Sequence, residues 1–252
     1  MALCDLHWFS SLLGKHVGTY VYIPDNPKPP MATFYLLHGL SDDYTIWLRR
    51  TSIERYATQH SLIVVMPDGF RSFYTNNASG FEYARYIGEE LVAKIEQIFP
   101  AAAKREARGI GGLSMGGYGA LRIALAYPET FASAISHSGA VMHGSRNQPR
   151  AGGALGEPEF RRIFGDAPMG TDHDLLALAR KAAEAKKLPK IRIDCGVDDD
   201  LIADNRAFHE KLLAMRVPHE YEEFPGGHNW EYWDTHVQEA LAFQSKHLST
   251  AR

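Results

Sequence analysis

The sequence predicts an α/β fold with a mainly parallel central sheet and helices on both of its faces. Strand-like apolar segments alternate with helix-like segments along almost the whole chain. Two of the apolar runs, 33–37 and 62–66, are nearly uninterrupted, as expected of strands that are covered on both faces. A Gly-x-Ser-x-Gly pentapeptide at 112–116 lies between an apolar run and a helix-forming run, which indicates a sharp strand-to-helix turn.

The first elements are two strands, a helix and a third strand. Residues 17–23 alternate and are rich in β-branched and aromatic residues, so they predict a strand, which a proline-rich turn ends. The next strand is 33–37, and the polar residues after it supply caps for a helix over 46–57. The run 62–66 is the third strand, because a Pro-Asp-Gly turn follows it.

Two helices and two strands follow in the middle of the chain. Residues 82–99 predict a helix, because their apolar residues recur at intervals of three and four. The segment 109–113 leads into the pentapeptide as a strand, and the alanine- and leucine-rich residues 120–126 leave it as a helix. A short strand is expected over 132–135.

The segment 141–168 differs from the rest, because it is rich in glycine and proline and has only weak periodicity. We expect it to be an insertion over the active-site face of a single domain that spans residues 1–252. After this segment the alternation resumes. Helix, strand, helix, strand and helix are expected, in turn, over 172–187, 191–195, 203–215, 219–224 and 230–247.

Size and composition suit one globular domain and exclude several classes of function. The chain has 252 residues, of which 45% are hydrophobic and 23% charged, and this is enough apolar material for a sizeable core. A formal net charge of -3 offers no basic face for nucleic acid, and no apolar run approaches the ~18 residues of a membrane span. The first residues lack the basic and apolar regions of a secretion signal, which favours a cytoplasmic protein.

The two cysteines, Cys4 and Cys195, are far apart in the sequence. We expect two buried thiols rather than a disulfide, as is usual in a reducing compartment. Neither cysteine lies in a metal-ligand spacing, so the sequence predicts no metal site, and the chemistry below needs no cofactor.

The pentapeptide places Ser114 where a nucleophile can project from a strained corner. Such a corner requires small residues two positions before and two positions after the serine, and Gly112 and Gly116 supply them. Because a strand enters this segment and a helix leaves it, we interpret it as a nucleophile elbow rather than an ordinary glycine-rich turn.

An elbow serine needs an acid and a histidine base, which follow it in that order along the chain. Of the twelve histidines, His228 fits best, because it lies in a glycine-rich loop between the last expected strand and the last expected helix. Loops at the carboxyl ends of parallel strands carry reactive residues in open α/β sheets. The histidines before Ser114, including His38, come too early in this order.

The acid is expected in the turn after the strand that ends at Cys195. Asp198, Asp199 and Asp200 all lie in this turn, and spacing alone does not choose among them. Two of the three are expected to be a solvated turn residue and a helix cap. The third would accept a hydrogen bond from His228 Nδ1 and fix the tautomer of the imidazole.

Two backbone N–H groups are expected to form an oxyanion hole. One belongs to Met115, the residue after the nucleophile. The other lies in the loop after the strand 33–37, where Gly39 lets the backbone turn and Leu40 is the candidate donor. The alternative for this loop is a plain strand-to-helix turn.

Four segments together resemble a known family. They are residues 36–42 (LLHGLSD) with Trp47, 111–120 (GGLSMGGYGA), 195–201 (CGVDDDL) and 226–233 (GGHNWEYW). They are similar to the family called "Putative esterase", which includes tributyrin-type esterases, S-formylglutathione hydrolases (esterase D) and the acetylxylan and feruloyl esterases of carbohydrate esterase family 1. Mycolyltransferases are distant members. The similarity extends over almost the whole chain.

The resemblance implies an α/β-hydrolase fold with a Ser-Asp-His triad. In the family the acid stands three residues after the glycine of a Cys-Gly turn, so the resemblance selects Asp199 among the three aspartates. Tyr118 in the elbow and the oxyanion loop 38–42 look more like the tributyrin-type branch. S-formylglutathione hydrolases more often have a histidine at the position of Tyr118 and a cysteine in the oxyanion loop.

The expected function is that of a serine carboxylesterase that hydrolyses short-chain acyl or aryl esters, such as acetyl or feruloyl esters, through an acyl-enzyme. An S-formylglutathione hydrolase-type thioesterase is the alternative, followed by an acyltransferase and by a non-catalytic binding protein of the same fold. The expected partner is a small-molecule ester, including an acylated carbohydrate, and neither nucleic acid nor a membrane. A homo-oligomer is compatible with the sequence.

The lining of the substrate pocket is the least defined part of this hypothesis. Trp47, Trp230 and the segment 160–164 are candidates, because aromatic rings there could stack on a phenolic acyl group. The alternative for Trp230 and Trp233 is core packing, since the two lie at helical spacing. No long apolar lid is visible, which favours short acyl chains.

Overall fold

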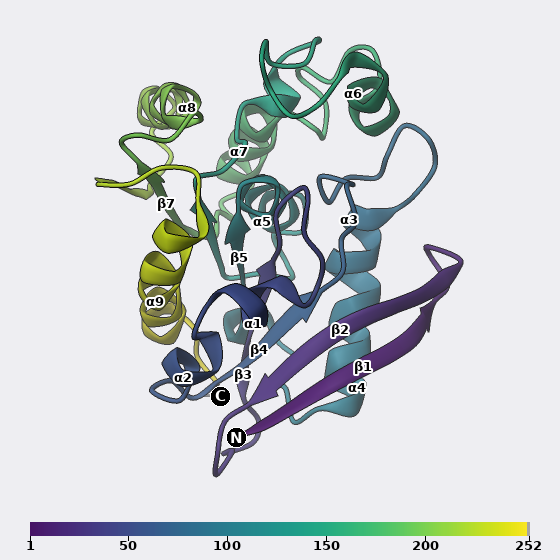
Figure 1. Cartoon of the computed structure of the whole chain (residues 1–252), viewed down its shortest axis with the longest axis vertical. Coiled ribbons are helices and arrows are strands. Elements are labelled where there is room, and N and C mark those ends of the chain that lie inside the picture. Colours follow the sequence, from purple (N-terminus) through teal and green to yellow (C-terminus); the bar gives the residue numbers. More distant parts are fainter. Residues whose placement is uncertain (251–252) are drawn as a thin grey trace.

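The computed structural model describes residues 1–250, and at their centre lies one sheet in the order β1-β2-β4-β3-β5-β6-β7-β8 (Figure 1). Every neighbouring pair from β4 to β8 is parallel, whereas β2 pairs antiparallel with both β1 and β4. The predicted class, a mainly parallel sheet, is confirmed. The strands are β1 (Ala2–Ser10), β2 (Lys15–Ile23), β3 (Ala32–Leu37), β4 (Leu62–Pro67), β5 (Arg108–Leu113), β6 (Ser133–His137), β7 (Lys190–Gly196) and β8 (Glu220–Phe224).

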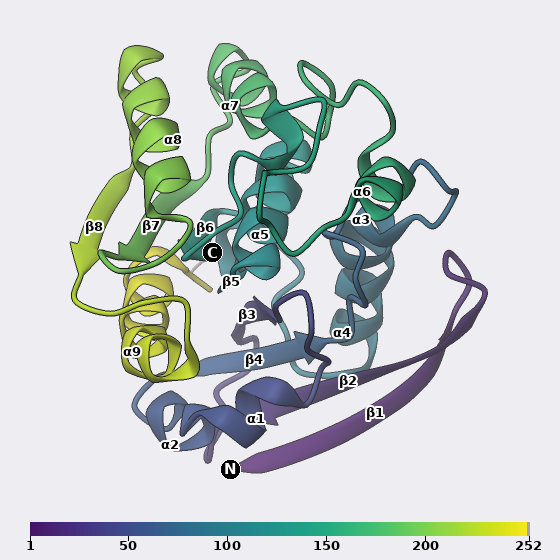
Figure 2. The same ribbon diagram turned by 45° about the horizontal axis from the view of Figure 1, so that its top comes forward.

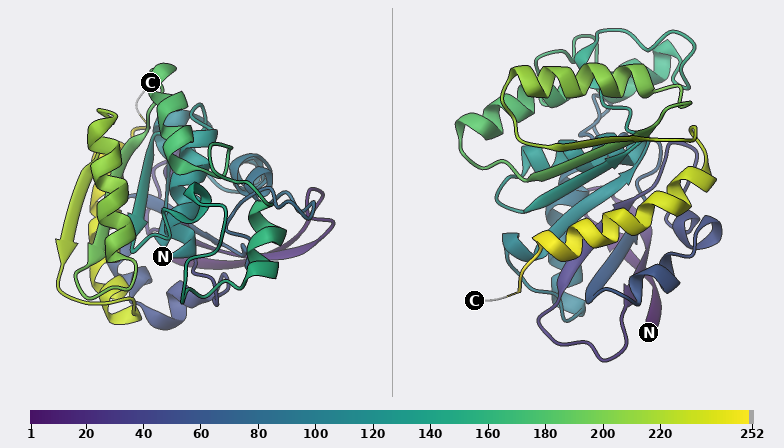
Figure 3. Two further views of the ribbon diagram at one scale, coloured as in Figure 1. Left: turned by 90° about the horizontal axis from the view of Figure 1, so that it is seen from above. Right: turned by 90° about the vertical axis from the view of Figure 1, so that its left-hand side faces the viewer.

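Helices cover both faces of the sheet. The main helices on one face are η1, α4, α5, α7 and α8, and those on the other are α1, α2 and α9. Figure 3 shows α8 and α9 on opposite sides of the sheet. The helical elements are α1 (Ile46–Arg50), α2 (Ile53–Ala57), α3 (Tyr83–Arg85), η1 (Tyr86–Leu91), α4 (Val92–Ile98), η2 (Arg105–Ala107), α5 (Met115–Ala126), η3 (His143–Ser145), α6 (Glu157–Phe164), α7 (Leu175–Glu184), α8 (Ile202–Ala214) and α9 (Trp230–His247).

The sheet divides the core into two parts, because side chains alternate along each strand. In β3, Tyr35 and Leu37 belong to the core that includes α5, whereas Phe34 and Leu36 belong to the core that includes α9. All four side chains are fully buried. This two-sided burial explains why the central strands appear in the sequence as uninterrupted apolar runs rather than as an alternating pattern.

The strand β1 was not expected from the sequence. It forms a regular antiparallel pair with β2, in which Cys4 lies opposite Val21. Residues that face the core alternate with residues that face solvent, but Leu3 and Phe9 on the outer face are also apolar and stand exposed. Apolar residues on both faces weaken the period-two pattern on which a sequence-based prediction depends.

The expected helix over 46–57 is two short helices, α1 and α2. Thr51 lies between them and donates its hydroxyl to the Trp47 carbonyl oxygen at 2.5 Å, while its Oγ1 accepts the Ile53 N–H at 3.1 Å. The Ser52 N–H donates to the Asp234 carboxylate of α9 at 2.9 Å. Side chains therefore take up the backbone groups that a continuous helix would have paired internally.

The glycine- and proline-rich segment 141–168 contains η3 and α6 and lies at the top of the molecule in Figure 1. Figure 2, in which the top comes forward, shows this segment in front of α5. Phe160 and Phe164 of α6 are almost fully buried, and the Phe164 ring packs edge-on against Tyr118 of α5 at 5.9 Å. The prediction that 160–164 lines a substrate pocket is wrong, because these rings fill the space between α6 and α5.

The two cysteines are both free thiols. Cys195 at the end of β7 is buried, as expected, but Cys4 is only half-buried. The difference follows from topology: β7 is an internal strand, whereas β1 is the edge of the sheet.

Candidate active site

Ser114 occupies the turn between β5 and α5 with φ +53° and ψ -114°, a backbone conformation that residues other than glycine rarely adopt. Two backbone hydrogen bonds hold it there. Its N–H donates to the His137 carbonyl oxygen at 2.9 Å, and its own carbonyl oxygen accepts the Ala140 N–H at 3.0 Å. A conformation of this kind costs about 1–3 kcal/mol, so the surrounding structure must enforce it.

The two glycines of the pentapeptide are required because β3 approaches the elbow closely. A Cβ atom at Gly112 would lie 2.7 Å from the Leu37 carbonyl oxygen, and a Cβ atom at Gly116 would lie 2.6 Å from the same oxygen. The obstructing atom belongs to the backbone, so no side-chain movement can relieve the contact. The requirement for small residues at these two positions therefore has a direct structural cause.

Three side chains from distant parts of the chain meet at the elbow. His228 Nε2 lies 3.0 Å from Ser114 Oγ, and His228 Nδ1 lies 2.8 Å and 3.1 Å from the two carboxylate oxygens of Asp199. The carboxylate only accepts, so Nδ1 carries a proton and Nε2 is free to accept the hydroxyl proton of Ser114. The structure thus aligns a hydroxyl, an imidazole and a carboxylate in one hydrogen-bonded row.

Asp199 differs from its two neighbours in both position and environment. Its side chain is buried and accepts the Leu201 N–H at 2.7 Å, whereas Asp198 and Asp200 are exposed. Burial by itself raises the pKa of Asp199. The hydrogen bond and charge of His228, together with the Leu201 N–H, outweigh burial and hold the pKa below its usual value. Asp199 is therefore the carboxylate that remains ionised against His228.

The two N–H groups considered for an oxyanion hole belong to Leu40 and Met115. Leu40 lines the cleft together with Ser114, and Met115 is the first residue of α5, so its N–H has no acceptor within the helix. In residues 1–250 neither N–H donates a hydrogen bond. Two unused donors beside a serine hydroxyl are the arrangement that stabilises a developing oxyanion.

The fold, the elbow and the row of three side chains correspond to a known family. The sequence profile of the family described as "Putative esterase" matches residues 10–244. The chain belongs to this family. It is therefore a carboxylic-ester hydrolase with the α/β-hydrolase fold, as the resemblance implied.

Individual relatives of this esterase are similar to it over its whole length. The acetyl esterase of Caldicellulosiruptor saccharolyticus is 34% identical over 263 residues, which covers 98% of this chain and 99% of the relative. Two solved structures from Staphylococcus aureus are each 36% identical, and in each case the match covers 97% of this chain and 98% of the other. They are the fluorophosphonate-binding serine hydrolase FphF, with a TM-score of 0.87, and the S-formylglutathione hydrolase FrmB, with a TM-score of 0.86.

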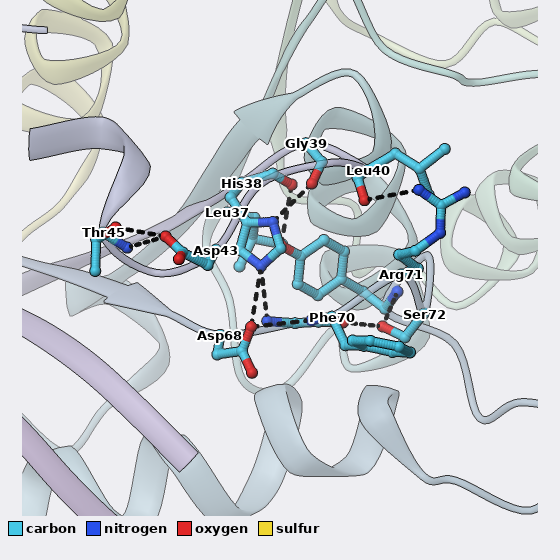
Figure 4. A network of polar contacts seen from close by, with 12 residues as sticks. Leu37, His38, Gly39, Leu40, Asp43, Thr45, Asp68, Phe70, Arg71 and Ser72 are labelled. Carbon is cyan, nitrogen blue, oxygen red and sulfur yellow. Dashed lines mark hydrogen bonds and ion pairs between the residues drawn. The ribbon is translucent and has the colours of Figure 1, made fainter. Parts of the chain in front are cut away.

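His38 is a buried residue beside the elbow of the esterase, although chain order excluded it as the base. Its Nδ1–H donates to the Gly39 carbonyl oxygen at 2.7 Å, and its Nε2 accepts the Gly69 N–H at 2.8 Å (Figure 4). The Tyr74 hydroxyl donates to the His38 carbonyl oxygen at 3.0 Å. In the sequence, the feature that pointed to this residue was the His-Gly pair directly after an apolar strand.

His38 orients the peptide group that contains the Leu40 N–H. In a trans peptide the carbonyl oxygen and the following N–H point in opposite directions. His38 Nδ1–H and the Asp42 N–H, the latter at 3.3 Å, both donate to the Gly39 oxygen and fix its direction. The Leu40 N–H of the same peptide is consequently fixed in the opposite direction, and Leu40 lines the cleft.

Replacing His38 with leucine is expected to lower kcat for p-nitrophenyl acetate by about 10²-fold and to change KM little, since a misdirected oxyanion donor acts mainly on the transition state. Steady-state kinetics of the purified variant measures this effect. His38→Gln, which keeps an amide donor near the Gly39 oxygen, should recover part of the loss. A folded His38→Leu variant with kcat within twofold of the parent would show that the loop 38–42 keeps its conformation without the His38 side chain.

The cleft above the elbow has a volume of about 740 Å³. Its outer part is bordered by exposed and half-exposed residues, among them Trp230 at the start of α9. Seven side chains of its lining are buried, namely those of Phe73, Leu113, Ala140, His143, Leu155, Leu201 and Trp233. We call the part of the cleft that is lined by Phe73, Ala140, His143 and Leu155 its closed end.

Trp47 does not line the cleft, contrary to the expectation from the sequence. Its side chain is fully buried, and its Nε1–H donates to the Leu37 carbonyl oxygen at 3.1 Å. Its ring meets the edge of the Trp230 ring at a centroid distance of 5.3 Å, so it supports Trp230 from behind. Trp230 itself borders the cleft, and so does Trp233, whose ring packs edge-on against His228 at 4.9 Å.

Proposed function

We propose that this esterase hydrolyses short acyl esters through a covalent acyl-enzyme on Ser114. The observation that carries the proposal is the unbroken row from Ser114 Oγ through His228 to Asp199, with distances of 3.0 Å and 2.8 Å. A serine whose hydroxyl already donates towards a neutral, oriented imidazole is an activated nucleophile.

In the first half of the reaction Ser114 Oγ attacks the ester carbonyl carbon while His228 Nε2 takes the hydroxyl proton. Asp199 stabilises the imidazolium that forms, without accepting its proton. The carbonyl oxygen becomes an oxyanion and is held by the Leu40 and Met115 N–H groups. His228 then donates its proton to the leaving alkoxide, the ester C–O bond breaks, and the acyl group remains on Ser114.

In the second half of the reaction, water takes the place of Ser114 Oγ as the nucleophile. His228 Nε2 removes a proton from the water as it attacks the acyl-enzyme, and the resulting oxyanion occupies the same two N–H donors. Collapse of this intermediate releases the carboxylic acid and returns the proton to Ser114 Oγ. An acceptor alcohol in place of water gives acyl transfer, which product analysis with added alcohols distinguishes from hydrolysis.

The segment 141–168 forms, in this proposal, the cover of the active-site face within a single domain. Leu155 of this segment lines the closed end of the cleft. Glu159 of α6 accepts two hydrogen bonds from Arg71, at 2.7 Å and 2.8 Å, and Arg146 pairs with Asp204 of α8 at 2.9 Å. Charged pairs at both ends of the segment therefore tie it to the rest of the molecule.

The 34% identity to an acetyl esterase supports acetyl and similarly small acyl groups as substrates. The outer part of the cleft has room for a larger alcohol, including a carbohydrate. Two free thiols are compatible with a cytoplasmic location. Within residues 1–250 no helix has both the length and the apolar character needed to cross a membrane.

An S-formylglutathione hydrolase activity is the second candidate, because the structure of an enzyme with that name is 36% identical to this chain. A formyl group also fits a small acyl site. Two features argue against this second candidate. The elbow has Tyr118, and the loop 38–42 has no cysteine, and both differ from the usual pattern of S-formylglutathione hydrolases.

A panel of substrates tests the proposed function. We expect kcat/KM for p-nitrophenyl esters to be highest between acetyl and butyryl and to fall at least about tenfold by octanoyl, if the buried side chains of the lining limit the length of the acyl chain. Methyl ferulate, acetylated xylan and S-formylglutathione complete the panel. A kcat/KM for S-formylglutathione far above that of every oxygen ester would favour the second candidate, and no hydrolysis of any substrate would reject both.

A further inference from the structure

His143 lies next to the nucleophile but has no part in the row of three side chains. The Ala140 N–H donates to the Ser114 carbonyl oxygen at 3.0 Å, and the His143 N–H donates to the Ala140 carbonyl oxygen at 3.1 Å. Two successive backbone hydrogen bonds thus connect the elbow to His143. The side chain of His143 is one of the four that line the closed end of the cleft.

The imidazole of His143 is held rigidly in one orientation. It is only 6% exposed, and its Nδ1–H donates to the Ala140 carbonyl oxygen at 3.1 Å. One face packs against the Phe73 ring at a centroid distance of 5.3 Å. Since a carbonyl oxygen cannot donate, Nδ1 must carry the proton, which leaves a lone pair on Nε2.

Within residues 1–250 the only side-chain hydrogen bond of His143 is the one made by Nδ1, and the residue borders the cleft. A buried ring that lines a cleft and has an unused acceptor is poised to receive a donor from whatever fills that cleft. The imidazole is also neutral under physiological conditions. Burial and the charges of Arg146 and Arg150 lower the pKa of His143 to about 4, against the opposing charge of Asp204.

The position of His143 corresponds to the acyl side of the reaction. The leaving oxygen must lie beside His228 Nε2 to receive its proton, and the carbonyl oxygen must lie at the Leu40 and Met115 N–H groups. The remaining substituent of the tetrahedral carbon is the acyl chain. The proposal below places it at the closed end of the cleft, which His143 helps to line.

We propose that His143 is a specificity-determining residue whose Nε2 accepts a hydrogen bond from a hydroxyl group on the acyl chain, so that short hydroxyacyl esters are the preferred substrate class. This assignment rests on the proposed esterase function. The other buried side chains at this end, such as Phe73 and Leu155, are apolar, so His143 supplies the polar recognition there.

A hydroxyl fits this acceptor better than a charged donor does. Arg146 and Arg150 lie close enough to His143 to lower its pKa by their charge, and they would repel an ammonium group in the same way. A neutral O–H donor avoids this repulsion and avoids the desolvation of an ion in a buried site.

Matched pairs of esters test the proposal. Hydrolysis of ethyl lactate and ethyl propionate, and of ethyl 3-hydroxybutyrate and ethyl butyrate, is followed by pH-stat, and the ratio of kcat/KM within each pair is compared among variants. In His143→Phe the ratio of hydroxylated to plain substrate should fall about three- to tenfold for at least one pair, which is the effect of one neutral hydrogen bond. Comparing ratios cancels both the intrinsic reactivity of each ester and any general loss of activity.

Two further variants separate recognition from packing. His143→Gln keeps an acceptor oxygen and should retain part of the preference. His173→Phe replaces a half-buried histidine that does not border the cleft, and it should leave both ratios unchanged. Ratios that are the same in the parent and in His143→Phe for both pairs would overturn the proposal, whatever the absolute rates.

Binding provides a test that does not depend on turnover. Affinities of methyl lactate and methyl propionate for the Ser114→Ala variant, with His143 intact or replaced by phenylalanine, can be measured by NMR titration. The lactate ester should bind about three- to tenfold more tightly only when His143 is present. Equal affinities in both backgrounds would refute the role of His143. If the parent enzyme bound methyl lactate but did not hydrolyse it, the proposed esterase function would be rejected and the role of His143 in binding would stand.

Discussion

Replacing Ser114 with alanine is expected to lower kcat for p-nitrophenyl acetate by about 10⁴- to 10⁶-fold. Without Oγ no acyl-enzyme forms, and catalysis is limited to what the oxyanion donors and His228 do for direct attack by water. The loss corresponds to about 5–8 kcal/mol of transition-state stabilisation. Single-turnover and steady-state kinetics measure it, with the parent protein assayed in parallel.

The structure of the Ser114→Ala variant should be intact, because alanine keeps the Cβ atom and the two backbone hydrogen bonds at the elbow. Its unfolding temperature is therefore the control for kinetics. An organophosphate should label the parent stoichiometrically and leave the variant unlabelled. If the folded variant kept more than a few per cent of the parent rate, Ser114 would not be the nucleophile.

Replacing Asp199 with asparagine is expected to lower kcat by about 10⁴-fold while the fold remains intact. The amide of asparagine can donate to His228 Nδ1, which favours the tautomer with the proton on Nε2. That proton would then point at Ser114 and block proton transfer from the hydroxyl. The loss of the carboxylate charge also removes the stabilisation of the imidazolium.

The neighbouring Asp198→Asn is the matched control, since its exposed side chain contacts neither Ser114 nor His228. It should change kcat less than about twofold. The comparison is made at constant pH with the same ester, because all three aspartates of the turn contribute charge. Loss of activity in Asp198→Asn with a normal rate in Asp199→Asn would show that Asp198, and not Asp199, is the acid that supports His228.

Some parts of the site were predictable because the signal is local. The Gly-x-Ser-x-Gly pattern at 112–116 reflects the close approach of the β3 backbone, which only glycine allows at both ends. His228 was identified from a loop at the end of a strand, and the structure places it 3.0 Å from Ser114. In both cases a few adjacent residues determine the backbone, and the backbone determines the direction of the side chain.

Other parts were not predictable, because they depend on how distant segments pack. Trp47 was expected in the pocket, but α1 turns its ring into the core beneath Trp230. His38 was set aside on chain order, yet it bonds to Gly39 and Gly69 and thereby orients the oxyanion loop. The edge strand β1 was missed, because apolar residues on its outer face obscure the alternation.

The amino-acid sequence by itself determined the α/β class, the elbow and the identity of the serine and histidine, since each follows from short-range sterics and periodicity. Spacing alone left three adjacent aspartates open; the family resemblance selected Asp199, and the tertiary structure places it against the imidazole. Burial and one short contact distinguish Asp199 from Asp198 and Asp200, and neither is a property of the local sequence. The same holds for His143, which backbone hydrogen bonds connect to Ser114 through Ala140, beyond the ends of the neighbouring strands β5 and β6.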